Sequence, residues 1–274
     1  MVGAGLETIL FLLTIAVYGV IFLFGIVIGS FLNVCIYRIP LGESLSKQRS
    51  HCMSCGYQLQ WFDLIPLFSW LFLRGKCRKC GAKISAQYPI IEATNGILYV
   101  LIFLVHGMNG WTEVIESVLY CLMASALLAL SVIDFRTFII PFGFNVFIFC
   151  LGLVNLGYRI FFTKSPDIWL YIIGFFVTSA ISGLLYLFGA MGGGDVKLLA
   201  ASGFLIGWKL SLLSFFAGCI IGAIIHPIRM KVSKQGRTLA MGPYLSAGIL
   251  LAVLWGYQFL DWYMKFTGLD KLFA

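Results

Sequence analysis

Two aspartates in a strongly apolar chain have the residue type and the setting to do chemistry. Asp195 directly follows Gly192-Gly193-Gly194, and Asp134 stands at the end of an earlier apolar run. Two apolar segments, each long enough to cross a bilayer, separate the two aspartates, so both are expected at the same membrane face. Two carboxylates that share a site do not both ionise easily. One keeps its proton while the other acts as a base, and such a pair can activate a water against a peptide carbonyl.

The same residues admit a structural interpretation, which the residue pattern alone leaves open. Aspartate is a favoured helix cap, so Asp195 can cap a helix that begins at Val196. Asp134 can pair with Arg136 at the membrane interface. A serine or cysteine protease is not favoured, because none of the three histidines has a nucleophile at a matching depth. These are His51, His106 and His226.

Four cysteines form a second group with a chemical pattern. They make two Cys-x2-Cys pairs with 21 residues between them, and a glycine follows each pair: Cys52, Cys55, Cys77 and Cys80. Two such turns present four thiolates to one Zn²⁺ at about 2.3 Å, and four protein ligands predict a structural rather than a catalytic zinc. Two disulfides or a redox pair are the alternatives. Stable disulfides are disfavoured because basic flanks place this loop in the reducing cytoplasm. His51, beside the first cysteine, is expected to be surface.

The composition indicates a protein that crosses a membrane many times. The chain of 274 residues is 61% hydrophobic and 11% charged, whereas soluble domains are about 45–50% apolar and about 25% charged. Eight apolar helices are expected, at 6–36, 89–106, 113–133, 138–161, 167–190, 196–208, 209–228 and 241–264. The segment 196–208 is short for a full crossing. The fold class is therefore all-α and polytopic, with about eight transmembrane helices and a small cytoplasmic zinc-binding insertion after the first. The expected domains are 1–37, 38–88 and 89–274.

The net charge of +8 is uneven along the chain. Eight of the 19 Lys and Arg lie from Arg38 to Lys83, and a second basic group is Arg229, Lys231, Lys234 and Arg237. The positive-inside rule places both groups in the cytoplasm and the N-terminus outside. No Lys or Arg precedes Arg38, so a cleaved signal peptide is not expected. Contact with anionic lipid explains the basic charge; nucleic-acid binding is not expected, since no recognition module accompanies it. The remaining cysteines are expected to be small buried residues: Cys35, Cys121, Cys150 and Cys219.

Several blocks of the chain resemble one known family along nearly its whole length. The block 192–198 fits the GxGD motif of membrane aspartyl proteases, with its trailing lysine, Lys197. Four further blocks match, at 29–40, 65–77, 88–92 and 242–245. Together they resemble type IV prepilin peptidases, the bacterial leader peptidases and N-methyltransferases of pilus, pseudopilus and competence systems. One departure is Phe142, where relatives often carry Asp or Asn.

The resemblance implies that Asp134 and Asp195 are catalytic, with Gly192, Gly194 and Lys197 supporting them. It implies a prepilin or pseudopilin substrate whose short basic leader is cut after a glycine, at the cytoplasmic face of the bacterial cell membrane. It further implies S-adenosylmethionine as the methyl donor for the new N-terminus, with no binding residues assigned, and pilus, secretion or competence assembly machinery as partner.

A basic leader needs acidic groups to hold it, because the cysteine loop is itself basic. The acids expected to face the leader are Glu43, Asp63, Glu92 and the aspartate pair. We hypothesise that Glu43 or Glu92 helps to hold the leader or the new amine; the alternative is that both are ordinary surface or interface carboxylates. Three alternatives remain: a peptidase with a purely structural zinc domain, a non-enzymatic zinc-ribbon scaffold, and a proton-coupled carrier.

Overall fold

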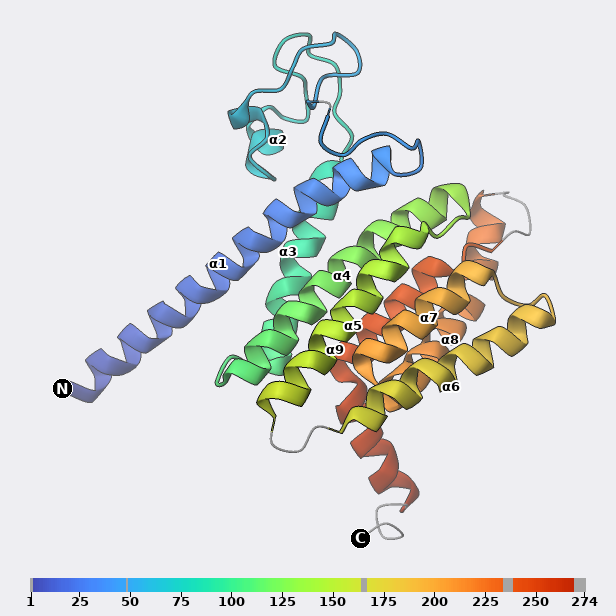
Figure 1. The fold of residues 1–274 in the computed structure, drawn as a ribbon. Helices are drawn as coiled ribbons and strands as arrows, with labels where there is room; N and C mark the ends of the chain where they lie inside the picture. Colours follow the sequence, from blue (N-terminus) through green and yellow to red (C-terminus); the bar gives the residue numbers. More distant parts are fainter. Residues whose placement is uncertain (1, 48, 164–166, 234–238, 269–274) are drawn as a thin grey trace. The chain divides into compact units, whose positions relative to one another are not determined.

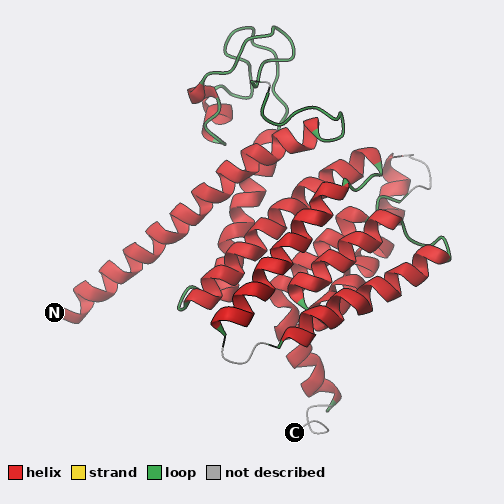
Figure 2. Cartoon of the chain, in the orientation of Figure 1, coloured by secondary structure: helices red, strands yellow, loops and turns green. Residues whose placement is uncertain are grey.

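The described part of the chain is helical, as the sequence predicts. This computed structural model describes residues 2–47, 49–163, 167–233 and 239–268, and no strand occurs among them (Figure 2). Seven of the described helices are long and apolar enough to cross a membrane. The remaining predicted segment, 196–208, corresponds to helix α7 (Gly193–Ile206), which has 14 residues and is not among the seven. Lys234 and Arg237 of the second basic group lie outside the described residues.

The chain divides into two compact units, Met1–Leu104 and Val105–Ala274. The first contains α1 (Val2–Arg38), a loop with the short helices η1 (Trp61–Asp63) and α2 (Phe68–Phe72), and most of α3 (Gln87–His106). The second contains the end of α3 and then α4 (Trp111–Thr137), α5 (Phe142–Phe162), α6 (Ile168–Leu187), α7, α8 (Trp208–Ser233) and α9 (Gly242–Thr267).

Helices α1 and α3 of the first unit meet backbone to backbone. A Cβ atom on Gly25 would lie 2.6 Å from the Cα of Gly96, and one on Gly29 would lie 2.7 Å from the Cα of Glu92. Small residues allow this approach, and interhelical hydrogen bonds reinforce it. The Asn95 amide donates to the Gly25 carbonyl at 2.7 Å. Asn33 donates across the same pair of helices to the carbonyl of Tyr88 at 3.2 Å.

In the second unit, α7 lies among the longer helices (Figure 1). Helix α7 packs against α5, α6, α8 and α9, while α4 packs against α5 and α9. Helices α6 and α7 touch where a Cβ on Gly174 would lie 2.2 Å from the Gly203 carbonyl oxygen. Thr178 also donates to the Leu199 carbonyl at 3.1 Å. Ten α7 residues are buried, so this short helix is surrounded by protein rather than by lipid.

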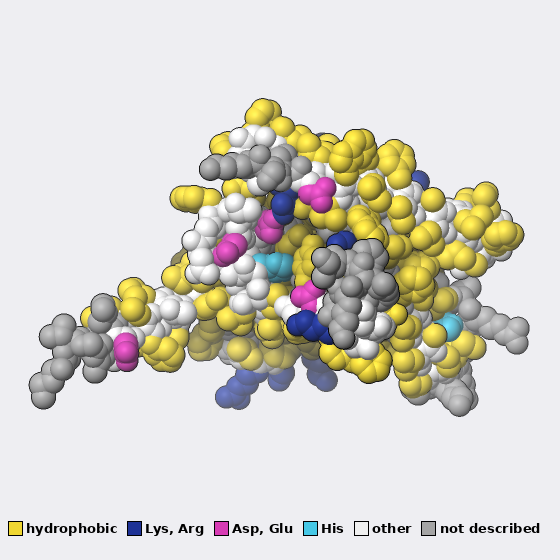
Figure 3. Space-filling view, turned by 90° about the horizontal axis from the view of Figure 1, so that it is seen from below, with side chains coloured by type: hydrophobic (Ala, Val, Ile, Leu, Met, Phe, Trp, Pro, Cys, Tyr) yellow, Lys and Arg dark blue, Asp and Glu magenta, His cyan; other side chains and the backbone are white. Residues whose placement is uncertain are grey.

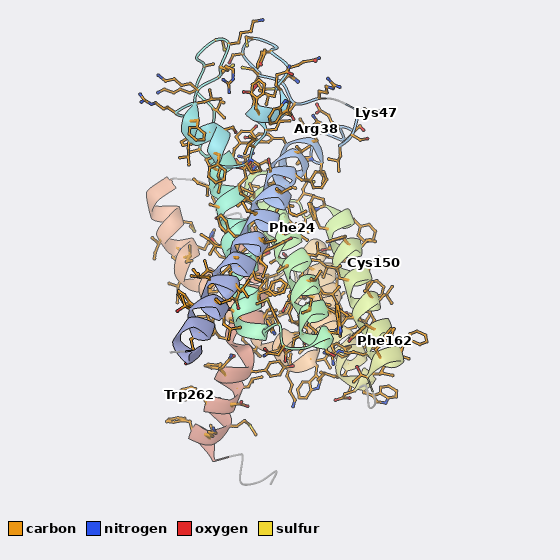
Figure 4. All side chains as sticks on the ribbon, turned by 90° about the vertical axis from the view of Figure 1, so that its left-hand side faces the viewer. Phe24, Arg38, Lys47, Cys150, Phe162 and Trp262 are labelled. Atoms are coloured by element: carbon orange, nitrogen blue, oxygen red, sulfur yellow. The ribbon has the colours of Figure 1, made fainter. Side chains whose placement is uncertain are left out.

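The outward surfaces are apolar, as a bilayer requires. Hydrophobic side chains cover most of the face in Figure 3. Phe162 and Trp262 point away from their helices in Figure 4, and they are 76% and 57% exposed. Trp262 also stacks on Phe266 at 5.5 Å. Aromatic side chains at helix ends suit the membrane–water interface.

The prediction for the four lone cysteines was half right. Cys35 and Cys121 are buried, but Cys150 is exposed and Cys219 is half-buried. Cys150 lies on the outer side of α5 (Figure 4), where lipid rather than protein covers an apolar side chain. Membrane proteins place apolar residues outside as well as inside, so hydropathy alone does not distinguish the two positions.

Candidate functional site

Asp134 lies near the end of α4 and is 4% exposed. Its Oδ2 atom accepts the backbone N–H of Gly242 at 2.9 Å. Gly242 is the first residue of α9, and Pro243 follows it, as is common where a helix begins. The first N–H groups of a helix have no partner within the helix and attract anions. Asp134 is therefore held at the N-terminus of α9, although it belongs to α4.

Asp195 is 7% exposed and lies within the first turn of α7. The helix begins at Gly193, three residues earlier than the start at Val196 considered from the sequence. Oδ2 of Asp195 accepts the N–H of Gly192 at 3.2 Å, the residue before the helix. The capping role is therefore present, but the carboxylate caps from inside the helix rather than from the position before it.

Asp134 and Asp195 come from neighbouring elements, because a Cβ on Gly194, next to Asp195, would lie 3.1 Å from the Cβ of Ile140, which follows the end of α4. Among the described residues, each of the two carboxylates receives a single hydrogen bond, and each receives it on Oδ2. Oδ1 of Asp134 and Oδ1 of Asp195 thus have no donor in the described part of the chain and are available to water or to a substrate. Two carboxyl groups with one such oxygen each have the functional groups that general acid–base hydrolysis needs.

Backbone surrounds the pair closely. A Cβ on Gly242 would lie 2.7 Å from Asp134 Oδ2, and one on Gly192 would lie 3.0 Å from Asp195 Oδ2. A Cβ on Gly194 would lie 3.1 Å from the Cβ of Ile140, whereas one on Gly193 would have ordinary contact, 3.5 Å, with Tyr186. Gly192 and Gly194 are the two glycines of the GxGD pattern. The positions where a Cβ would be too close to a neighbouring atom are therefore those where the pattern has glycine.

Lys197, on the next turn of α7, extends toward α5. Its Nζ lies 5.1 Å from the centre of the Phe142 ring, a cation–π distance. The structure thus gives Phe142, the residue that departs from the family pattern, a partner on α7.

The four cysteines of the loop come together as predicted. Their Sγ atoms all lie within 4.8 Å of one another, and those of Cys52 and Cys80 are 3.9 Å apart. Sulfurs bound tetrahedrally at about 2.3 Å from a zinc lie about 3.8 Å apart. None of the four is in a disulfide. Backbone N–H groups of Ser54 and Cys55, the largest causes, lower the pKa of Cys52 to about 6 and so favour a thiolate. The cluster can therefore bind a metal ion.

The two cysteine turns have the same backbone pattern. Gly56 N–H donates to the Cys52 carbonyl, and Gly81 N–H donates to the Cys77 carbonyl, each at 2.9 Å. Both glycines have a positive φ, 69° and 72°, which other residues rarely adopt. The glycine that follows each pair therefore makes the turn possible. His51 is exposed and is not part of the cluster.

Asp63 links the two cysteine turns, a role that the sequence analysis missed. Its Oδ1 accepts Arg78 Nε at 2.8 Å, and its Oδ2 accepts the Tyr57 hydroxyl at 3.3 Å. Burial acts to raise the pKa of Asp63, but hydrogen bonds from Arg78 and the Gln60 N–H outweigh it and hold the pKa below its ordinary value. Tyr57 follows the first turn and Arg78 lies in the second, so one carboxylate connects both.

The two candidate leader-binding acids differ in their surroundings. Glu92 is 6% exposed, and its Oε2 accepts the Leu67 N–H at 2.7 Å. Glu92 therefore connects α3 to the loop at the start of α2. Glu43 is an exposed loop residue.

Two protein-family models match separate parts of the chain. The model of the Bacterial Peptidase A24 N-terminal domain matches residues 23–106, and that of the Type IV leader peptidase family matches residues 121–226. A prepilin leader peptidase/N-methyltransferase of Bacillus subtilis (strain 168) is 32% identical over 254 residues, covering 90% of this chain and 97% of that relative. The chain belongs to the prepilin leader peptidase/N-methyltransferase family. It is a multi-pass membrane protein.

Other members of the family show similar agreement. The protein of that name from Xanthomonas campestris pv. campestris is 33% identical, over 89% of this chain and 93% of the relative. That from Stutzerimonas stutzeri is 30% identical over the same shares. No solved structure matches the chain. The first family model covers all four clustered cysteines, and the second covers both Asp134 and Asp195.

Proposed function

We propose that the chain removes the short basic leader of prepilin-like proteins with Asp134 and Asp195, cutting after a glycine, and methylates the new N-terminus. The observation that carries the proposal is the pair of buried carboxylates of Asp134 and Asp195, in each of which Oδ1 has no donor among the described residues. Membership of the prepilin leader peptidase/N-methyltransferase family supports both activities.

Hydrolysis needs one ionised and one protonated carboxyl group. The ionised group takes a proton from a water molecule, and the water oxygen bonds to the scissile carbonyl carbon. The protonated partner gives its proton to the carbonyl oxygen, which completes a tetrahedral intermediate. Transfer of a proton to the leaving nitrogen then breaks the carbon–nitrogen bond and releases the leader and the new amine. The Gly242 and Gly192 N–H groups hold the two carboxylates in orientation by bonding each Oδ2.

Methyl transfer is the second proposed activity. The nitrogen of the new amine would take the methyl group from the sulfur of S-adenosylmethionine. S-adenosylhomocysteine would be the leaving group, and the methylated amine would lose a proton. No residue of the chain is assigned to this co-substrate. The four cysteines would hold a zinc ion whose role is to stabilise the loop, since four thiolate ligands leave no open position.

Orientation follows from the distribution of charge. The loop between α1 and α3 carries much of the basic charge, including Arg38 and Lys47 at its start (Figure 4), and the positive-inside rule assigns it to the cytoplasm. Even numbers of crossings then return the end of α4 and the start of α7 to that face. We therefore propose a bacterial cell-membrane enzyme with its N-terminus outside and its active site at the cytoplasmic boundary, which serves pilus, secretion or competence machinery.

The deciding experiment uses the full chain in detergent or nanodiscs with a prepilin-like substrate. Asp134→Asn and Asp195→Asn should each lower the cleavage rate by about 10²–10⁴-fold, the usual contribution of a general acid or base. Full cleavage by either variant would exclude the dyad. Mass spectrometry of the product with S-adenosylmethionine tests methylation separately, and cleavage without a mass gain of one methyl group would leave a peptidase with a structural metal domain.

A further inference from the structure

Asn145 in α5 is a polar residue in the buried part of the second unit. Its side chain is 3% exposed, and among the described residues neither Nδ2 nor Oδ1 has a partner. A buried amide without partners costs free energy, and native structures contain few of them. Asn155, on the same buried face of α5, shows the ordinary solution, since its Nδ2 donates to the Leu205 carbonyl at 3.3 Å. Asn145 therefore keeps a donor and an acceptor unused at a cost to the fold.

Asn145 lies near the level of Asp195. Helices α5 and α7 run side by side in the same direction (Figure 1), because Phe142 lies under Lys197 at their starts and Asn155 bonds to Leu205 near the end of α7. Asn145 is three residues into α5, about 4.5 Å along its axis, and Asp195 is in the first turn of α7. The buried face of α5 starts at Asn145, so this amide is the member of that face nearest the aspartate end.

We propose that Asn145 is a positioning residue, which binds a backbone peptide group of the substrate beside the bond that is cut. This inference rests on the proposed peptidase function. A peptide bond can be attacked only where the substrate is not helical, and there its N–H and C=O groups lose their partners. In apolar surroundings those groups must be satisfied by protein. A side-chain amide has the matching donor and acceptor, so Asn145 can pair with one peptide group through both.

Replacing Asn145 by leucine separates this role from a structural one. Asn145→Leu removes two unsatisfied polar atoms and keeps a similar size, so its melting temperature should equal or exceed that of the wild type. Its kcat/KM for cleavage should fall about ten-fold or more, because the transition state loses the hydrogen bonds between Asn145 and the substrate. A structural residue would instead lower stability and activity together. Ser211→Ala is the matched control, because Ser211 Oγ is also buried without a partner among the described residues but lies beside Gly203, far along α7. That control should leave cleavage unchanged.

Ester-containing substrates provide a second test that does not depend on the stability of a variant. An ester in place of one peptide bond removes a single N–H from the substrate. At the position that pairs with Asn145, the ester should slow the wild type about ten-fold yet have little further effect on Asn145→Leu, the non-additivity expected of interacting groups. Additive effects at every position flanking the cleavage site would overturn the proposal. Equal cleavage by wild type and Asn145→Leu would overturn it while leaving the peptidase intact, whereas no cleavage by the wild type would remove the proposed function itself.

Discussion

The backbone N–H of Gly242 donates a hydrogen bond of 2.9 Å to Oδ2 of Asp134, a residue 108 positions earlier in the chain. This bond joins the end of α4 to the start of α9. It also gives the carboxylate a fixed orientation, with Oδ2 on the protein and Oδ1 free. The candidate site is therefore built from three places in the sequence, the end of α4, the start of α7 and the start of α9.

The first prediction concerns the space at Gly242. A Cβ there would lie 2.7 Å from Asp134 Oδ2 and 3.1 Å from its Cγ. Gly242→Ala should push the carboxylate aside and lower cleavage by about ten-fold or more, since small misplacements of catalytic groups are costly. Gly183→Ala on α6 is the control, because a Cβ there meets nothing within 4 Å. Equal cleavage by the two variants would contradict the assigned role of the bond.

The second prediction distinguishes neighbours within the glycine run. Gly194→Ala would bring a Cβ to 3.1 Å from the Ile140 side chain, whereas Gly193→Ala would make an ordinary 3.5 Å contact with Tyr186. We expect Gly194→Ala to reduce cleavage several-fold more than Gly193→Ala, because the start of α7 must shift away from Ile140. The two variants differ by one position, so their rates can be compared directly in membranes of equal protein content. The reverse order would mean that Gly194 is not a packing position.

The third prediction concerns the metal. Purified chain should contain about one zinc per molecule by elemental analysis, and Cys55→Ser should lose most of it, since three thiolates bind more weakly than four. Cys150→Ser, an exposed cysteine outside the cluster, should retain the metal. Because binding free energy of this kind is folding free energy, chelation should make the loop between α1 and α3 sensitive to protease. Disulfides between the four cysteines, found by mass spectrometry of protein whose free thiols are alkylated at cell lysis, would contradict a metal site.

The fourth prediction concerns the link between the cysteine turns. Asp63→Asn should destabilise the loop by about 1 kcal/mol, measured as faster proteolysis, because the charged bond from half-exposed Arg78 is lost. The folded pKa of Asp63 lies below its ordinary value, so its stabilisation is present above the unfolded pKa of about 3.9 and is lost only as the pH falls through the lower folded value. The difference from wild type should thus stay constant from about pH 5.5 to 8. Glu43→Gln, at an exposed acid, should match the wild type.

The fifth prediction tests whether Glu92 senses the charge of the leader. Glu92→Gln keeps the side-chain size and the contact to Leu67 but removes the negative charge. If the carboxylate holds the basic leader or the new amine, the variant should lose about two- to ten-fold of the rate advantage that a lysine-rich leader has over one with fewer lysines. An unchanged preference would limit Glu92 to connecting α3 with the loop. Glu43→Gln tested in parallel decides between the two acids.

Hydropathy predicted the helices well because a bilayer permits few other structures. Each of the eight expected segments is a helix, and the short one at 196–208 is the helix that is too short to be a candidate span. Cysteine spacing predicted the cluster for a similar reason, since two turns with the same geometry have few ways to direct their sulfurs. The cysteine turns depend on residues that are close in sequence, and the helices depend on the bilayer, which requires backbone groups to be hydrogen-bonded within the protein.

The contacts that could not be predicted join residues distant in sequence. Nothing in the local pattern says that Gly242 bonds to Asp134, although Gly-Pro at a helix start indicates free N–H groups. Asp63 was expected to attract the leader, but it is already occupied by Arg78 and Tyr57. Asn145 carried a usable signal, a polar residue within an apolar helix. Its lack of partners is visible only once neighbouring helices are packed around it.

The glycine crossing of α1 and α3 has a consequence for how the protein assembles. Both ends of the cysteine loop are attached to these helices, at Arg38 and Gln87, and the helices touch at Gly25, Gly29 and Gly96. Pairing of the helices in the bilayer therefore brings the two ends of the loop together without any need for a metal ion. The entropy of bringing distant cysteines together is reduced in advance. Metal uptake should accordingly follow membrane insertion, and a bulky residue at Gly25 should delay loading even though it lies far from every sulfur.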